Sequence, residues 1–244
     1  GGALPIAITD TRACSVAWDP DEGGFHYTRY PAGDQYHRSV HHHRIGSAPD
    51  GADDPVVWAE HPTPEAWPSV LASPDGGWLL VSVSVGWSRA DLHLLNRATG
   101  EWHTLVEGED VNTLFAFAGD TRLIGTTTHR APRGRLVTID LTAPLPTSPA
   151  DWQELVTERD VVVGPPAVAG DGFYTIASLA GVDRLEYWRL DGTGPQLVPV
   201  PNVSAVVGLD AAGTRATDAV AIVAGFGEPP GVWRVTPDSA ARVH

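Results

Sequence analysis

Histidines are the residues of this sequence best suited to bind a metal ion, because three of them are consecutive. His41, His42 and His43 follow one another, and His37 lies four residues before the first of them. Zinc binds through imidazole nitrogens, usually four ligands to one ion. On a β-strand, however, successive side chains point to opposite faces, so that three adjacent histidines do not face one ion. We therefore expect partnered or solvent-facing strand histidines and no metal site.

Carboxylates could bind calcium or act in pairs on a glycosidic bond. Asp19 and Asp21 lie close together, and Asp53 and Asp54 are adjacent, but neither pair has the fixed spacing and central glycine of a calcium loop. Turn formation explains these residues, since aspartate hydrogen-bonds its own backbone in turns. A glycosidase would need two carboxylates in one cleft. The sequence offers acids without showing that any two converge.

Serine nucleophiles need a base and a specific backbone turn. No G-x-S-x-G elbow occurs in the chain, and Ser73 and Ser178 lie in strand or turn contexts with no base nearby in the sequence. We expect these serines to be structural. The sequence therefore predicts no catalytic residue and no cofactor, and a chain that is not itself a hydrolase.

The composition indicates one globular domain and excludes several partners. The chain has 244 residues, 42% of them hydrophobic, and a net charge of −14 that would repel nucleic acid. The single cysteine, Cys14, excludes an internal disulfide, which favours a cytoplasmic protein. The sequence has no apolar run of 18 residues and no basic start at residues 1–8, so we expect that the protein spans no membrane and has no signal peptide. Because methionine is absent, we expect that the chain is a segment of a longer protein.

Residues 69–107 contain the clearest structural unit, four short strands joined by turns. Apolar and β-branched runs alternate there with turn residues such as Pro74, Gly76 and Gly100. The unit recurs along the chain: Phe25, Trp78, Leu123 and Phe173 each follow a comparable turn and are 53, 45 and 50 residues apart. We expect blades at residues 14–60, 69–107, 113–158, 166–200 and 204–236. A four-stranded unit of this size is typical of a β-propeller blade.

The predicted fold is thus all-β, a single propeller domain over residues 1–244 with about twenty strands and almost no helix. The first strand of each blade is expected to line the central axis. Five blades could close into a ring or form an open arc of a seven-bladed ring. An open arc would expose apolar blade faces, so we favour the closed five-bladed ring and regard a homodimer as the other remedy.

Several motifs of the sequence resemble the propeller of the prolyl oligopeptidase family of serine peptidases. Residues 17–31 are similar to its "W-x-x-D-G-x-G-F-x-Y-x-R-Y" stretch, and residues 43–46 to the end of its "Y-x-H-x-L-G" strand. Further matches follow in the family's order at residues 54–57, 73–80 and 226–233. The chain corresponds to roughly the last five of the family's seven blades. The two leading blades and the α/β-hydrolase catalytic domain are not among the 244 residues.

The resemblance implies that the chain is the non-catalytic propeller of a serine oligopeptidase. Its partners would be an α/β-hydrolase domain and short peptides, with Ala72, Ala116 and Ala167 near a narrow central tunnel. The resemblance also implies that Trp87 forms an apolar wall of the substrate cavity; the alternative is a loop aromatic packed on the adjacent blade. Ala13 departs from the family, which often has an aromatic residue there. A self-standing propeller that binds a protein, peptide or carbohydrate is the alternative function.

Overall fold

The computed structural model describes residues 6–201, 204–211, 213, 215–225 and 227–243 of the chain. Within these residues the secondary structure is β-sheet, apart from one short 3-10 helix. The strands form five antiparallel sheets, and in four of them neighbouring strands follow the order of the chain. Backbone contacts divide the chain into two compact units, Gly1–Asn112 and Thr113–His244. The prediction of an all-β fold built from five blade-sized sheets is therefore confirmed.

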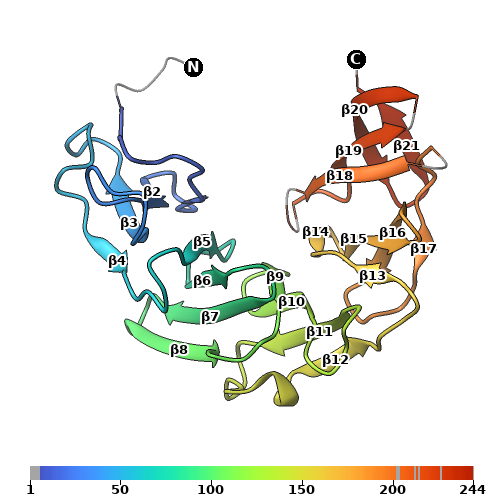
Figure 1. Ribbon diagram of the computed structural model, residues 1–244, viewed down its shortest axis with the longest axis horizontal. Coiled ribbons are helices and arrows are strands. Elements are labelled where there is room, and N and C mark those ends of the chain that lie inside the picture. Colours follow the sequence, from blue (N-terminus) through green and yellow to red (C-terminus); the bar gives the residue numbers. More distant parts are fainter. Residues whose placement is uncertain (1–5, 202–203, 212, 214, 226, 244) are drawn as a thin grey trace. The chain divides into compact units, whose positions relative to one another are not determined.

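The first unit contains two four-stranded meanders (Figure 1). The first sheet consists of β1 (Val16–Trp18), β2 (Gly24–Arg29), β3 (Ser39–Arg44) and β4 (Val56–Trp58). The second sheet consists of β5 (Trp67–Ala72), β6 (Trp78–Val85), β7 (Arg89–Asn96) and β8 (Glu101–Val106). The second sheet matches the unit predicted at residues 69–107, although β5 begins two residues earlier than expected.

The turn between β5 and β6 shows how the sequence fixes the second sheet. Ser73 Oγ donates to Asp75 Oδ1 at 2.6 Å and accepts from the Trp78 backbone N–H at 2.9 Å. Gly76 adopts a φ of 73°, which favours glycine. A Cβ on Gly76 would lie 2.8 Å from the Pro20 ring, so the two turns touch. Ser73 thus closes the turn between β5 and β6.

The core of the first unit lies between its two sheets and follows the strand alternation. Leu79, Val81 and Val83 occupy one face of β6, where their side chains are fully buried. Val40 of β3 and Val70 of β5 belong to the same cluster, together with Ala17, Trp58 and Ala66. The period of two in the sequence therefore places these residues in the core.

The second unit contains three further sheets. The first consists of β9 (Thr113–Phe117), β10 (Arg122–Thr127), β11 (Arg135–Asp140) and β12 (Gln153–Val156), with the 3-10 helix η1 (Pro149–Asp151) before β12. The next consists of β13 (Val162–Val163), β14 (Ala167–Ala169), β15 (Gly172–Leu179), β16 (Val182–Arg189) and β17 (Gln196–Leu197). The last consists of β18 (Ser204–Ala211), β19 (Ala219–Gly225), β20 (Glu228–Thr236) and β21 (Ser239–Arg242).

Two of these sheets differ from the expected strands. In the fourth sheet both β13 and β14 pair with β15, so that five strands are present where four were expected. Pro165 and Pro166 lie between β13 and β14, and proline has no N–H to donate to a ladder, which explains the interruption. In the fifth sheet β21 lies beyond residue 236, where the prediction ended; its Ser, Ala and Arg residues carry no apolar alternation.

Two apolar clusters form the core of the second unit. Ile124, Leu136, Phe173 and Trp188 are fully buried between the sheets of β9–β12 and β13–β17. Tyr174 packs with Val235 of β20 in the other cluster. Closure of the five blades into a ring stays a prediction, as does the single propeller domain over residues 1–244. Phe226, where the last family-like motif begins, lies outside the described residues. No helix in the described part of the chain is long and apolar enough to cross a membrane.

Candidate functional site

Trp87 lies at the tip of the hairpin between β6 and β7. Gly86 precedes it with a φ of 65°, and the Trp87 residue is 99% exposed. At this exposure the ring packs on neither sheet of the first unit. A fully exposed tryptophan leaves a large apolar surface in water and is typical of contact sites. Its role as a cavity wall stays a prediction.

An arginine stacked between aromatic rings occupies the same end of the first unit. The Arg38 guanidinium lies 3.6 Å from the Trp67 ring centroid and 4.3 Å from that of Tyr30. It donates to the carbonyl oxygens of Arg12 and Ala13 at 3.3 Å each and to the Tyr30 hydroxyl. Arg38 is 2% exposed, so aromatic faces and carbonyl oxygens compensate its buried charge.

Strand register places Arg38 and Trp87 at one end of the sheets. Trp67, the first residue of β5, pairs with Ser84 near the end of β6, and Trp87 follows three residues later. A cavity of about 200 Å³ opens there, lined in part by Tyr30, Arg38 and Trp67. We call this the Trp87 end of the first unit. Ala13, whose carbonyl oxygen accepts a hydrogen bond from Arg38, lies beside the stack with a φ of 51°. Its methyl side chain adds no aromatic ring to the stack.

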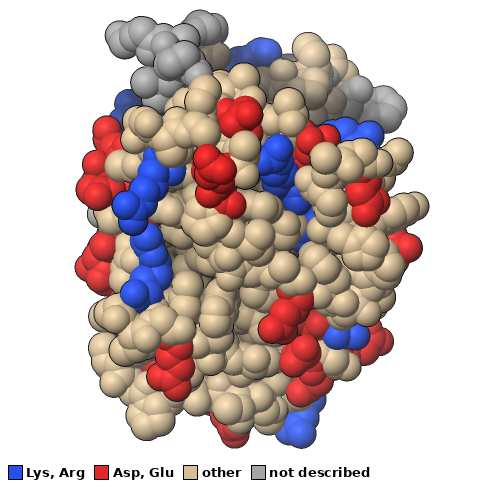
Figure 2. Space-filling view, turned by 90° about the vertical axis from the view of Figure 1, so that its left-hand side faces the viewer, with Lys and Arg blue, Asp and Glu red and all other residues tan. Residues whose placement is uncertain are grey.

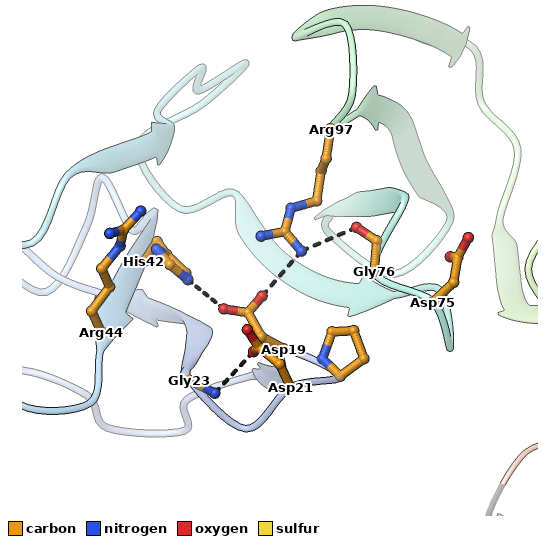
Figure 3. Close-up of a pocket in the computed structure, with 9 residues that line it drawn as sticks. Asp19, Asp21, Gly23, His42, Arg44, Asp75, Gly76 and Arg97 are labelled. Carbon is orange, nitrogen blue, oxygen red and sulfur yellow. Dashed lines mark hydrogen bonds and ion pairs between the residues drawn. The ribbon is translucent and has the colours of Figure 1, made fainter.

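The opposite end of the same sheets carries a charged cluster (Figure 3). Consecutive antiparallel strands turn at alternate ends, which puts the β1–β2, β5–β6 and β7–β8 turns together. Asp19 contacts His42 Nε2 through Oδ2 at 2.7 Å and Arg97 Nη1 through Oδ1 at 3.0 Å. Arg97 also donates to the Gly76 carbonyl oxygen at 3.1 Å. These residues line a cavity of about 560 Å³, and we call this the Asp19 end.

The surroundings shift the pKa values of two groups at the Asp19 end. Burial alone would raise the pKa of Asp19, but its hydrogen bond with His42 and the charge of Arg97 outweigh burial and hold this pKa below its usual range. Burial, with the charges of His42 and Arg97, lowers the pKa of His26 to about 4. At neutral pH Asp19 is therefore ionised and His26 is neutral.

The three consecutive histidines alternate in their contacts, as expected for a strand: His41 and His43 both contact Asp54, whereas His42 does not. His43 Nδ1 lies 3.0 Å from Asp54 Oδ2, and the same carboxylate accepts from the Tyr27 hydroxyl at 2.9 Å. His41 Nε2 lies 2.9 Å from Ser39 Oγ. His42 instead points to Asp19. The family-like residues His43 and Asp54 thus form a buried structural network.

A cluster that the sequence reasoning missed joins His42 to residues of other segments. His26 of β2 lies directly opposite His42 of β3, and their ring centroids are 4.5 Å apart. Ligand atoms of Asp19, His26 and His42 all lie within 4.8 Å of one another. The prediction considered only neighbours along one strand, whereas this cluster depends on the β2–β3 register. Asp19 forms the predicted turn through its carbonyl oxygen, which accepts from Glu22 N–H at 3.0 Å.

The remaining candidate serine is structural. Ser178 Oγ donates to Asp183 Oδ1 at 2.5 Å across the β15–β16 pair. Asp183 Oδ2 in turn accepts from the Val206 backbone N–H at 2.9 Å. The carboxylate therefore joins β16 to β18, and Ser178 lies in the ladder between β15 and β16.

Charges are interspersed on the face of the molecule shown in Figure 2. Arginine and acidic side chains lie next to one another on that face, with broad uncharged areas between them. All 16 basic residues are arginine, against 30 acidic residues. This face therefore offers no broad patch of one sign to a polyion.

The sheets and their repeat define a propeller-type domain, and comparison with known proteins assigns its family. A family model described as "Prolyl oligopeptidase, N-terminal beta-propeller domain" matches residues 3–242. The chain therefore belongs to the family of prolyl oligopeptidase N-terminal propeller domains. A search of curated proteins found no match.

Solved structures agree in fold. A prolyl endopeptidase studied for inter-domain dynamics is 21% identical with a TM-score of 0.84, over 97% of this chain and 35% of its own. Prolyl oligopeptidase B from Galerina marginata is 19% identical with a TM-score of 0.76, over 90% and 31%. Oligopeptidase B from Leishmania major is 18% identical with a TM-score of 0.74, over 94% and 33%. The chain thus spans about a third of the length of these proteins.

Proposed function

We propose that this domain is the non-catalytic propeller of a serine oligopeptidase, where it caps the active site of an α/β-hydrolase domain and admits short peptides. The match of the family model to residues 3–242 carries the proposal. The relatives' descriptions support it: the Galerina marginata enzyme is described with a 35-residue hydrolysis and macrocyclization substrate. Preference for cleavage after proline is part of the same proposal.

The Trp87 end of the first unit is the surface that we assign to the catalytic domain and substrate. Trp87 projects fully into solvent, and at the same end of the sheets two rings and two carbonyl oxygens hold the Arg38 guanidinium in place. An ordered surface with one projecting apolar side chain could line the path of a peptide toward the nucleophile of the catalytic domain.

The propeller would restrict access to the active site according to the size of the substrate. Ala72, Ala116 and Ala167 are half-buried residues of β5, β9 and β14, and small side chains there would leave a passage too narrow for a folded protein. We propose that the five blades close into a ring around this passage. A solution-scattering envelope with an open wedge, or a dimer joined through the terminal blades, would count against closure.

A substrate-size series tests gating. The full-length parent protein is incubated with a proline-containing octapeptide and with a folded protein that carries the same eight residues in an ordered segment. We expect cleavage of the peptide and at least a 100-fold lower kcat/KM for the folded protein. Comparable cleavage of both substrates would show that the propeller does not restrict access. The same carrier protein, unfolded by reduction and alkylation, shows whether the segment itself is a substrate.

A further inference from the structure

We propose that Asp19, His26 and His42 form a binding site for one divalent transition-metal ion, with Zn²⁺ as the best-fitting cation. The three residues come from three successive segments: Asp19 follows β1, His26 lies on β2 and His42 on β3. Cross-strand pairing of the two histidines and the position of the turn bring one carboxylate oxygen and two imidazole nitrogens within 4.8 Å of one another. Two imidazoles and a carboxylate are a recurrent donor set for zinc.

His26 supplies an independent observation that points to a ligand. The residue is 3% exposed, and its Nδ1 atom has no hydrogen-bond partner among the described residues. This nitrogen faces Asp19 Oδ1 at 3.8 Å, too far for a hydrogen bond. Buried polar atoms are almost always paired, so an unpaired imidazole nitrogen aimed at a carboxylate needs an explanation. A metal ion held between the two atoms provides one.

The ligand atoms lie close enough for an ion to draw them together by side-chain rotation. Zinc lies about 2.0–2.1 Å from nitrogen or oxygen ligands, so two of its tetrahedral ligands are roughly 3.3 Å apart. Asp19 Oδ1 and His26 Nδ1 are separated by 3.8 Å, and Asp19 Oδ2 and His42 Nε2 by 2.7 Å. The two histidines therefore face different oxygens of one carboxylate, and the three ligand atoms, which lie within 4.8 Å of one another, have to be drawn together by side-chain rotation to bind one ion.

The site is accessible from one side. The His42 side chain is 15% exposed, and with Asp19 it lines the cavity of about 560 Å³ in Figure 3. Asp21 lines the same cavity, with its Oδ1 accepting from the Gly23 N–H at 2.9 Å. An ion entering from the cavity would find three protein ligands and room for a water as the fourth.

Arg97 opposes the ion and gives the proposal a distinctive consequence. Its Nη1 lies 3.0 Å from Asp19 Oδ1, where its positive charge repels a cation. The same nitrogen also donates to the Gly76 carbonyl oxygen at 3.1 Å, so Arg97 keeps a partner when it leaves Asp19. Removal of the Arg97 charge should therefore strengthen metal binding. If the Asp19–Arg97 ion pair only stabilised the fold, its removal would not affect the affinity for a metal ion in this way.

The three residues occupy open positions of the family-like stretches, so the site is a feature of this chain. In "W-x-x-D-G-x-G-F-x-Y", Asp19 and His26 fall on positions where any residue is written, and His42 does so in "Y-x-H-x-L-G". A bound ion would fasten the β1–β2 turn to β2 and β3. The expected effect is greater thermal stability of the whole chain.

Calorimetric titration of the complete, tag-free chain with Zn²⁺ tests the proposal, with Co²⁺ absorption as the spectroscopic readout. We expect one saturable site, visible bands of a four-coordinate cobalt ion, and a Tm that rises with Zn²⁺ and falls with EDTA. His42→Gln should weaken binding at least tenfold, and Arg97→Gln should strengthen it severalfold. Because His42 is partly exposed, its variant should still fold, which circular dichroism in EDTA verifies. His26→Gln is the corresponding change at the buried ligand.

His37→Gln is the matched control. His37 Nδ1 lies 3.0 Å from Asp34 Oδ2 on the surface, and its ring is 5.8 Å from that of His61, so these residues are the alternative place for an ion. The variant should bind Zn²⁺ as the unchanged chain does. No saturable binding, binding that survives both His42→Gln and His26→Gln, or binding lost only in His37→Gln would overturn the proposal.

Discussion

Asp54 illustrates how one buried carboxylate organises the first sheet. Its side chain is 4% exposed and accepts from the Tyr27 hydroxyl, while His43 Nδ1 lies within hydrogen-bond distance of both carboxylate oxygens. The neighbouring carboxylate also contributes to raising the pKa of Tyr27, after the larger effect of burial, so the phenol stays neutral and donates.

Substitution of Asp54 should destabilise the fold. Asp54→Ala leaves the Tyr27 hydroxyl and the His43 ring without their partner in a buried place, which we expect to cost about 2–3 kcal/mol of the free energy of unfolding. Denaturant unfolding followed by tryptophan fluorescence measures the loss. Asp53→Ala is the control, since Asp53 is exposed; a change there should stay within about 0.5 kcal/mol. Equal losses in the two variants would contradict the network.

Trp87 should matter for function and not for stability. Because the residue is 99% exposed, Trp87→Ala removes no packing, and we expect the free energy of unfolding to change by less than about 0.5 kcal/mol. In the full-length parent, loss of an apolar cavity wall should raise the KM for a short peptide about 5- to 30-fold, corresponding to about 1–2 kcal/mol. Trp102→Ala, at a residue 38% exposed on the edge strand β8, is the comparison. An unchanged KM would remove Trp87 from the substrate path.

At the scale of elements, the turn between β5 and β6 is held by conformation and by contact. Gly76→Ala puts a Cβ at a φ of 73° and 2.8 Å from Pro20. Gly100→Ala puts one at a φ of 75° with no atom within 4 Å. Both variants bear the cost of the left-handed conformation, about 1 kcal/mol. Gly76→Ala should cost about 1–3 kcal/mol more, and equal losses in thermal unfolding would show that the turns do not pack.

A strand could be predicted where the residues that define it lie close together in the sequence. Alternating apolar residues and the Ser73–Gly77 turn define β5 and β6, since each signal lies within a few residues. β21 was missed because its four residues carry no apolar alternation, and its place depends on pairing with β20. The double start of the fourth sheet was missed because Pro165 and Pro166 interrupt it.

The candidate site depends more on tertiary contacts than the strands do. The position of Trp87 in a hairpin loop follows from Gly86 and the flanking strands. Two other features do not follow from the local sequence. The Arg38 stack needs contact between two sheets, and the cluster of Asp19, His26 and His42 needs the register of β2 and β3. Asp19 and Arg97 lie far apart in the sequence, so no local sequence pattern indicates that they are in contact.

At the scale of the whole molecule, the chain is a propeller domain of the prolyl oligopeptidase family that lacks a nucleophile elbow. Acyl transfer needs a nucleophile, a base and an oxyanion hole in one constellation. Ser73 and Ser178, the two serines considered, serve a turn and a cross-strand contact. In our account access is a property of this domain, and catalysis is a property of the hydrolase domain that we propose as its partner.

The most direct test compares the purified chain with the full-length parent in one assay. Both are incubated with a chromogenic Gly-Pro substrate and with a fluorophosphonate probe that labels activated serines. We predict that the parent hydrolyses the substrate and is labelled, whereas the isolated chain does neither. Labelling of the isolated chain, or a parent that reacts with neither reagent, would contradict the account.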